Sequence, residues 1–175
     1  MMRKGAWIVA AVALAAGVLL GAQASKKATY VDHRYGFAIE APDFPGSGKV
    51  PVVMPLAMSG PAKDGFSSNV NVMVQRVKTT RDAYRRQTHG QFKAAGFTVN
   101  EDRDVRVSGK NALWIDYEGQ RQGKALRWLA LAVIDTDRVL LITCTCPKDR
   151  FAAHKAAFTT CQESFHLLGG EGATE

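Results

Sequence analysis

The chain has 175 residues, and its 23 lysines and arginines against 16 aspartates and glutamates give a formal net charge of +7. This length fits one domain that follows a short leader segment. A basic balance of this size is also typical of nucleic-acid-binding proteins, but the N-terminal segment points to export and so excludes cytosolic functions and a nucleic-acid partner.

The first 24 residues have the pattern of a secretory signal peptide. A basic start is followed by an apolar run over residues 5–22, and alanines occupy positions 22 and 24. This pattern predicts cleavage between Ala24 and Ser25 and export of the mature protein to the periplasm or the extracellular space. The alternative is an uncleaved membrane anchor, because 18 apolar residues lie at the lower limit for a spanning helix.

Export leaves three explanations for the positive charge of the mature chain. The charge contacts anionic lipid, contacts an acidic protein partner, or simply keeps the protein soluble. Export also permits disulfides among the three cysteines. The domain is expected to span residues 25–168, and the small polar residues 169–175 are expected to form a disordered tail.

The first part of the domain is expected to contain short strands and loops. Thr29–Val31 and Phe37–Ile39 are strand candidates with a turn between them. Residues 41–65 hold five of the six prolines and four glycines, which predicts irregular loops with one short strand over Val50–Met54. Alternating valines over residues 70–74 predict a half-buried strand.

A helix is predicted to begin at Thr79 and to end at Gly96. Tyr84 and Phe92 fall on its apolar face. Four basic residues point away from that face: Arg85, Arg86, His89 and Lys93. Charged helix faces are usually solvated, so a solvated ridge is the simplest interpretation, and a partner surface is the alternative.

The second half of the domain is predicted to be an antiparallel meander followed by a helix. Its four strands cover residues 97–107, 112–118, 126–134 and 139–146, with a turn over 119–123. The third strand is apolar on both faces, which is typical of a central strand covered on both sides. A final helix over residues 148–165 carries an apolar stripe that must pack on the sheet: Phe151, His154, Phe158, Cys161 and Phe165. The fold class is therefore α+β, with layers of helix and sheet.

The sequence offers no catalytic pattern and no set of metal ligands. The histidines lack metal-ligand spacing, and a mixed site at His154 and Cys161 lacks the spacing of zinc motifs. Residues 119–125 differ from a phosphate-binding loop in spacing and join two strands. We therefore predict a protein that is not an enzyme and that uses no cofactor. The alternative is a thiol-dependent enzyme using Cys144 and Cys146, although a strand lacks the helix N-terminus that lowers a thiol pKa.

A disulfide between Cys144 and Cys161 is predicted from the path of the final helix. The helix advances about 16 Å before it reaches Cys161, which corresponds to about five strand residues. Cys144 therefore lies closer to Cys161 than Cys146 does. A bond between Cys144 and Cys146 would be strained.

The order of several weakly specific segments resembles the PsbP-like superfamily, which includes bacterial exported DcrB-like proteins. The segments are Tyr30–Ile39, Ser68–Val72, Ala95–Phe97, Val107–Ala112 and Leu141–Pro147, followed by Phe151, Phe158, Ser164 and Phe165. The resemblance implies an α/β/α sandwich around an antiparallel sheet with two main helices. It also implies a non-enzymatic role in binding another envelope or extracytoplasmic protein. It identifies neither the partner nor the oligomeric state.

Three functions are therefore carried forward. The first is an exported protein-binding or assembly module. The second is an envelope-surface protein that binds anionic lipid or polymer through the basic helix face. The third is the thiol-dependent enzyme.

Overall fold

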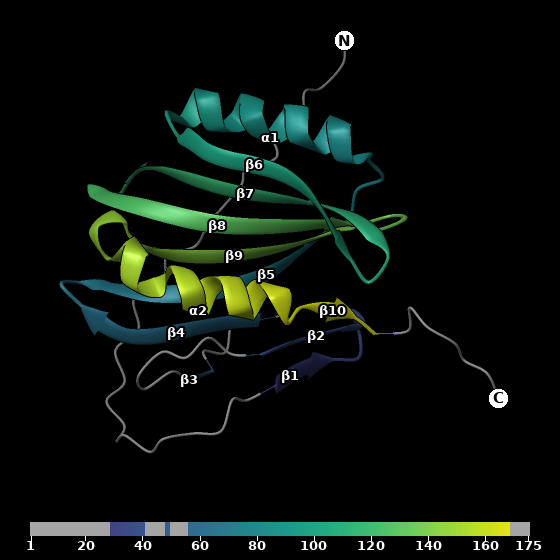
Figure 1. Ribbon diagram of the computed structural model, residues 1–175, viewed down its shortest axis with the longest axis horizontal. Coiled ribbons are helices and arrows are strands. Elements are labelled where there is room, and N and C mark those ends of the chain that lie inside the picture. Colours follow the sequence, from purple (N-terminus) through teal and green to yellow (C-terminus); the bar gives the residue numbers. More distant parts are fainter. Residues whose placement is uncertain (1–28, 41–47, 50–55, 169–175) are drawn as a thin grey trace, which may run out of the picture.

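A computed structural model describes residues 29–40, 48–49 and 56–168 (Figure 1). Three sequence predictions lie outside these residues: the signal peptide 1–24 with its cleavage site between Ala24 and Ser25, the strand at Val50–Met54, and the tail 169–175.

The described residues form two α-helices, one 3-10 helix and ten strands. The strands are β1 (Thr29–Asp32), β2 (Phe37–Glu40), β3 (Gly48–Lys49), β4 (Leu56–Lys63), β5 (Phe66–Gln75), β6 (Thr98–Val107), β7 (Lys110–Arg121), β8 (Lys124–Ile134), β9 (Val139–Pro147) and β10 (His166–Leu167). The helices are α1 (Arg81–Ala95), η1 (Lys148–Arg150) and α2 (Phe151–Glu163).

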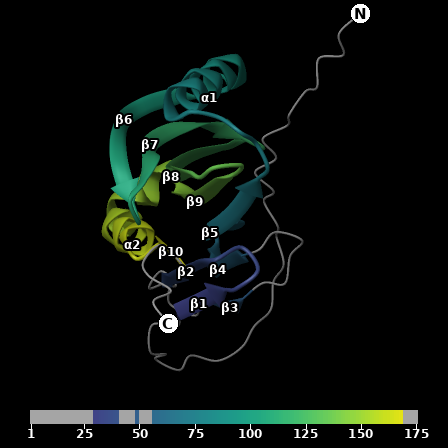
Figure 2. The ribbon, with the colours of Figure 1, turned by 90° about the vertical axis from the view of Figure 1, so that its right-hand side faces the viewer.

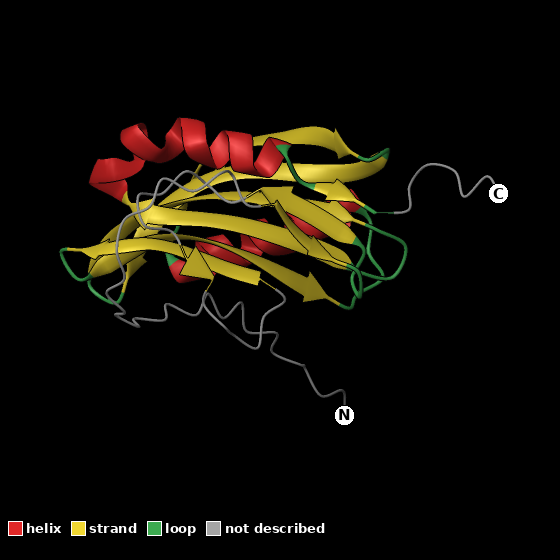
Figure 3. Ribbon diagram, turned by 90° about the horizontal axis from the view of Figure 1, so that it is seen from below, coloured by secondary structure: helices red, strands yellow, loops and turns green. Residues whose placement is uncertain are grey.

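The strands pair into two antiparallel sheets. The larger has seven strands in the order β3-β4-β5-β9-β8-β7-β6, and the smaller has the order β1-β2-β10. The predicted meander is present as β6 to β9, and β5 extends it on the β9 side. Yellow strands make up most of the described domain in Figure 3.

The two α-helices cover opposite faces of the large sheet, which lies between them in Figure 2. Leu113, Ile115 and Tyr117 of β7 belong to the buried cluster with Tyr84 and Phe92 of α1. The other face of the sheet packs against α2 and the small sheet, in a cluster that includes the β7 tryptophan at position 114. The α+β class, the two main helices and the α/β/α arrangement predicted from the sequence are thus confirmed.

Three hairpins of the large sheet close through two-residue turns. Both central residues have positive φ: 55° and 69° at Asp64 and Gly65, 47° and 73° at the turn of residues 108–109, and 51° and 74° at Gln122 and Gly123. These values fit type I′ turns, whose twist matches that of paired strands. The predicted five-residue turn over 119–123 was therefore too long, because β7 and β8 stay paired up to the two turn residues.

The prediction of irregular structure through residue 65 was also wrong, because residues 56–63 form the eight-residue strand β4. Its ladder with β5 shifts register between Ser59 and Ala62. Pro61 lies within that shift, where a missing N–H removes no ladder hydrogen bond. Proline and glycine content alone therefore overstated the irregularity of this segment.

Helix α1 begins one residue later than predicted. Thr80, not Thr79, is the N-cap, and its side chain accepts a hydrogen bond from the Ala83 N–H at 3.2 Å. Gly96 ends the helix with φ of 72°, as predicted from its freedom to adopt the left-handed conformation.

Aromatic rings fill the space between α1 and the sheet. The ring centroids of Phe92 and Tyr117 are 4.1 Å apart, and those of Tyr117 and Trp128 are 5.0 Å apart. Phe97 packs 5.1 Å from Trp128 and covers Gly119, where a Cβ atom would collide with the ring. The strand glycine is therefore required by this close approach.

Helix α2 buries the predicted stripe against the opposite face. Phe151, Phe158, Cys161 and Phe165 are each 4% exposed or less, and His154 is half-buried. The buried amide of Gln162 adds polar contacts that the sequence analysis missed. Gln162 accepts a hydrogen bond from Trp114 Nε1 at 2.9 Å and donates one to the Leu129 carbonyl at 3.0 Å.

Candidate functional site

Three basic residues of α1 contact two acids of β6, the neighbouring edge strand. His89 Nε2 lies 2.7 Å from Asp102 Oδ2, and Arg85 Nε lies 3.0 Å from the same oxygen. Asp104 also binds Arg85, and its Oδ2 lies 2.7 Å from Arg81 Nη1. These five residues form a network, called here the α1–β6 charge network.

The spacing of the two elements explains the network. Arg81, Arg85 and His89 follow one another at four-residue steps, about 6 Å each along a helix. Asp102 and Asp104 are two residues apart on a strand, which is about 6.6 Å. A helix that lies along this strand therefore places its basic side chains opposite the two acids.

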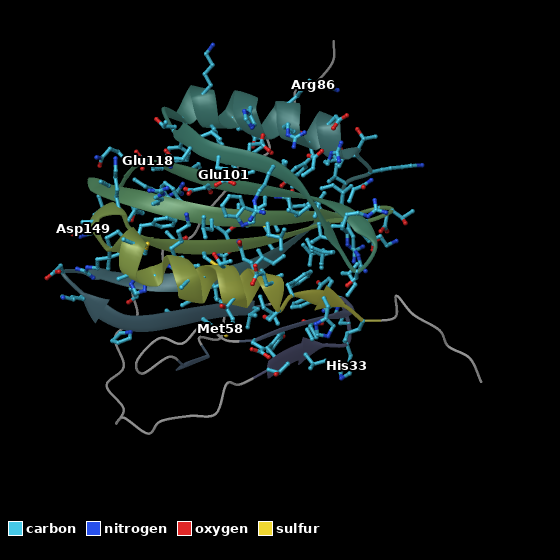
Figure 4. The ribbon with its side chains drawn as sticks, in the orientation of Figure 1. His33, Met58, Arg86, Glu101, Glu118 and Asp149 are labelled. Atoms are coloured by element: carbon cyan, nitrogen blue, oxygen red, sulfur yellow. The ribbon has the colours of Figure 1, made fainter. Side chains whose placement is uncertain are left out.

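The four basic residues of the predicted ridge consequently divide into two pairs. Arg85 and His89 are engaged with acids, and the Asp104 and Asp102 hydrogen bonds raise the pKa of Arg85. Arg86 and Lys93 are exposed, and Figure 4 shows Arg86 on the outer side of α1. The sequence analysis missed the division because the acids lie beyond the helix, on a strand whose position was unknown.

A second ion pair lies on the α2 side of the sheet. Arg127 donates two hydrogen bonds to Asp116, at 2.8 and 2.7 Å, and Asp116 is 2% exposed. The Asp116 hydrogen bond raises the pKa of Arg127. The Arg127 guanidinium also lies 3.9 Å from the centroid of the Phe151 ring, which places the cation between β7 and α2.

The three cysteines are buried free thiols. Cys144 forms a side-chain hydrogen bond with Cys161, and Cys161 Sγ donates to the Glu40 carbonyl at 3.2 Å. Burial, followed by the Cys161 contact, raises the pKa of Cys144 well above its ordinary value. Burial also raises the pKa of Cys146 to about 12. Burial therefore favours the protonated thiol over the nucleophilic thiolate at Cys144 and Cys146.

His154 takes part in a packing contact between α2 and β5. Its Nε2 lies 3.2 Å from Ser68 Oγ on β5. Burial, together with the nearby Arg150, lowers the pKa of His154, so the ring is neutral at pH 7. Within residues 29–40, 48–49 and 56–168, no three histidine, cysteine or acidic side chains are arranged to hold a metal ion.

Both helices of the described chain are too short or too polar to cross a lipid bilayer.

The predicted disulfide has a direct test. We expect peptide mapping of the exported protein without reductant to recover Cys144 joined to Cys161, because the structure places these two thiols in contact. On the chain-entropy model, this bond would close a loop of about 17 residues and add about 3 kcal/mol of stability. Replacing Cys146 with serine is the control and should leave the bond intact. Recovery of Cys146 joined to Cys161, or of three free thiols, would contradict the prediction.

Comparison with known proteins identifies the fold. The sequence matches no protein-family model and no curated protein. Among solved structures, it is similar to CyanoP, the cyanobacterial PsbP of Synechocystis sp. PCC 6803, with 16% identity and a TM-score of 0.61 over 87% of this chain and 98% of that one. It is also similar to LpqN, which is involved in cell envelope biogenesis of Mycobacterium tuberculosis, with 15% identity and a TM-score of 0.59 over 82% and 91% of the two chains.

A third similar structure is a protein of unknown function from Pseudomonas aeruginosa, with 18% identity and a TM-score of 0.50 over 80% of this chain and 96% of that one. Identities this low show a common fold and no common activity. The two helices, the antiparallel sheet between them and these structural likenesses together show that the chain has a PsbP-like fold.

Proposed function

We propose that this protein is an exported, non-catalytic module that binds another envelope or extracytoplasmic protein. The PsbP-like fold carries the proposal, and LpqN shows that this architecture occurs in a protein involved in cell envelope biogenesis. The described interior supports it, because its polar side chains serve packing. Asp116, Gln162 and His154 each bind other parts of the domain.

The state of the cysteines weighs against the thiol-dependent alternative. Cys144, Cys146 and Cys161 are each no more than 2% exposed, and burial raises the pKa of Cys144 and Cys146. A catalytic cysteine needs an accessible thiolate. Slow reaction of the reduced native protein with a thiol reagent, and rapid reaction after denaturation, would support this assignment. A fast-reacting native thiol would support an enzyme.

The α1–β6 charge network also weighs against binding of anionic lipid or polymer through the helix face. Arg85 and His89 share their charge with Asp102 and Asp104, so the outer face presents mainly Arg86 and Lys93. Arg86 and Lys93 lie on an exposed helix face, where salt screens their attraction for an anion within about 8 Å.

Site-specific crosslinking in cells tests the protein-binding proposal. Val31 and Val77 are the large hydrophobic residues that are most exposed in the described structure, at 42% and 38%. Photo-crosslinking residues placed at these positions and at Lys93 should give a discrete adduct with one protein. Excess unmodified protein should compete with that adduct. Absence of a competable adduct from all three positions would contradict the proposal.

The proposed export predicts a defined N-terminus for the mature protein. We expect intact-mass measurement of the exported protein to give a chain that begins at Ser25, because the basic start, the apolar run and the alanines at 22 and 24 define a cleavage site. Replacing Ala24 with a bulky residue should block or displace the cut. A wild-type mass that retains residues 1–24 would indicate a membrane anchor instead.

A further inference from the structure

A cleft of about 660 Å³ opens at one end of the domain, where three connecting segments meet. Residues 78–80 lead into α1, residues 109–111 belong to the β6–β7 hairpin, and residues 134–136 enter the β8–β9 turn. Arg106 of β6 and Ala83 of α1 complete the lining. Of the lining residues, Ile134 packs against the buried cluster beneath α1, and the others lie outside both buried clusters.

Cations outnumber carboxylates around this cleft. Lys78, Arg106 and Lys110 line it, and Asp135 is its one acidic residue. Asp135 is already bound by Lys110 Nζ at 3.0 Å and by Arg138 Nη2 at 3.2 Å. Burial raises the pKa of Asp135, but Lys110 and a backbone hydrogen bond outweigh it and give a net lowering. The acid is therefore ionised and its charge is already balanced.

Two cations remain without a carboxylate partner among the residues that the structure describes, Lys78 and Arg106. Arg106 Nη1 donates to the neutral side-chain oxygen of Asn111 at 2.9 Å, which leaves its other N–H groups available. Both side chains belong to exposed residues, so neither is required to stabilise the core. Their charge is available to an external anion.

The hydrogen-bonding groups of the cleft fit a compact oxyanion. A guanidinium offers several N–H donors in one plane and an ammonium offers three, and both suit phosphate oxygens. Thr80 Oγ1 accepts the Ala83 N–H, so its own proton remains to be donated. Because this threonine already caps α1, an anion in the cleft would be bound by side chains and not by free N–H groups at the helix end.

We propose that this cleft binds a phosphate group, through Lys78 and Arg106 with Thr80 as an additional donor. The group belongs either to a soluble phosphate compound or to a phospholipid headgroup, and the chemistry of recognition is the same for both. This inference does not depend on the proposed protein partner.

Titration of the mature protein with inorganic phosphate at constant ionic strength tests the proposal. Backbone amide shifts in NMR spectra should map to residues 78–80 and 109–111. The double variant Lys78→Gln/Arg106→Gln should bind at least about tenfold more weakly, since charge-assisted hydrogen bonds are lost. The matched control is Arg86→Gln/Lys93→Gln, which removes the same charge from the outer face of α1 and should bind phosphate like the parent.

Vesicles distinguish the two sources of the phosphate group. Binding to phosphatidylglycerol vesicles that is lost in the Lys78→Gln/Arg106→Gln variant, but kept in the control variant, would identify a lipid headgroup. Phosphate binding without vesicle binding would identify a soluble compound. If neither probe binds, or if both variants lose binding equally, the proposal is wrong. Thermal unfolding of each variant should match the parent, which separates loss of binding from loss of folding.

Discussion

Replacing Phe158 with alanine is expected to lower the free energy of unfolding by about 3–5 kcal/mol. Phe158 is fully buried in the cluster between α2, the large sheet and the small sheet. Its ring also stacks 5.5 Å from that of His154. Truncation removes these contacts and leaves a cavity that a rigid sheet cannot collapse to fill. Urea denaturation, followed by a helix-sensitive signal, measures the change.

Lys155→Ala provides the control for this measurement, since Lys155 is exposed on the same helix. It should change the stability by no more than about 0.5 kcal/mol, as surface substitutions usually do. A Phe158→Ala midpoint that equals that of the parent would show that the α2 stripe does not face the core.

The second large effect is expected at the buried ion pair. Arg127→Met should lower the free energy of unfolding by about 3 kcal/mol, near the lower end for breaking a buried pair because the Arg127 side chain is 25% exposed. The variant leaves the Asp116 carboxylate in the interior without its bidentate partner. It also removes the cation from the face of the Phe151 ring. Denaturant unfolding at pH 7 gives the measurement.

Two further variants test the cause of this loss. Lys148→Met removes a more exposed pair, in which Lys148 Nζ lies 2.6 Å from Glu118 Oε1, and should cost no more than about 1 kcal/mol. Adding Asp116→Asn to Arg127→Met should restore part of the stability, because no buried charge then remains unpaired. If the single Arg127→Met variant loses less than Lys148→Met does, the buried charge is not the source of the stability.

Local patterns in the sequence determined both helices and most strands. The α1 residues Tyr84 and Phe92 recur at helical spacing on one face, and the stripe through Phe158 and Cys161 does the same for α2. These periods depend only on backbone geometry, so they can be recognised without knowing which elements meet. Gly96 could be predicted as the end of α1 for the same local reason. Helix and strand rise favoured Cys144 over Cys146 as the neighbour of Cys161. The structure places Cys144 and Cys161 in contact as free thiols, and the bond between them stays a prediction.

Contacts between distant segments were decided only by the tertiary structure. β4 was hidden by its one proline and one glycine, and it forms a strand because β5 pairs with it both before and after the register shift. The two residues of β10 form a strand only because β2 is present to pair with them. The pairing of β10 with β2 joins residues far apart in sequence, so no local period predicts it.

The candidate sites likewise depend partly on local sequence and partly on the tertiary structure. The sequence by itself determined that α1 carries a basic outer face, but only the fold set Asp102 and Asp104 of β6 beside Arg85. The sequence alone did not show the cleft, because Lys78 and Arg106 are nearly 30 residues apart and line the same cleft only in the folded domain. Charge and periodicity are properties of the chain, whereas the neutralisation of one cation and the availability of another depend on which side chains the folded sheet brings together.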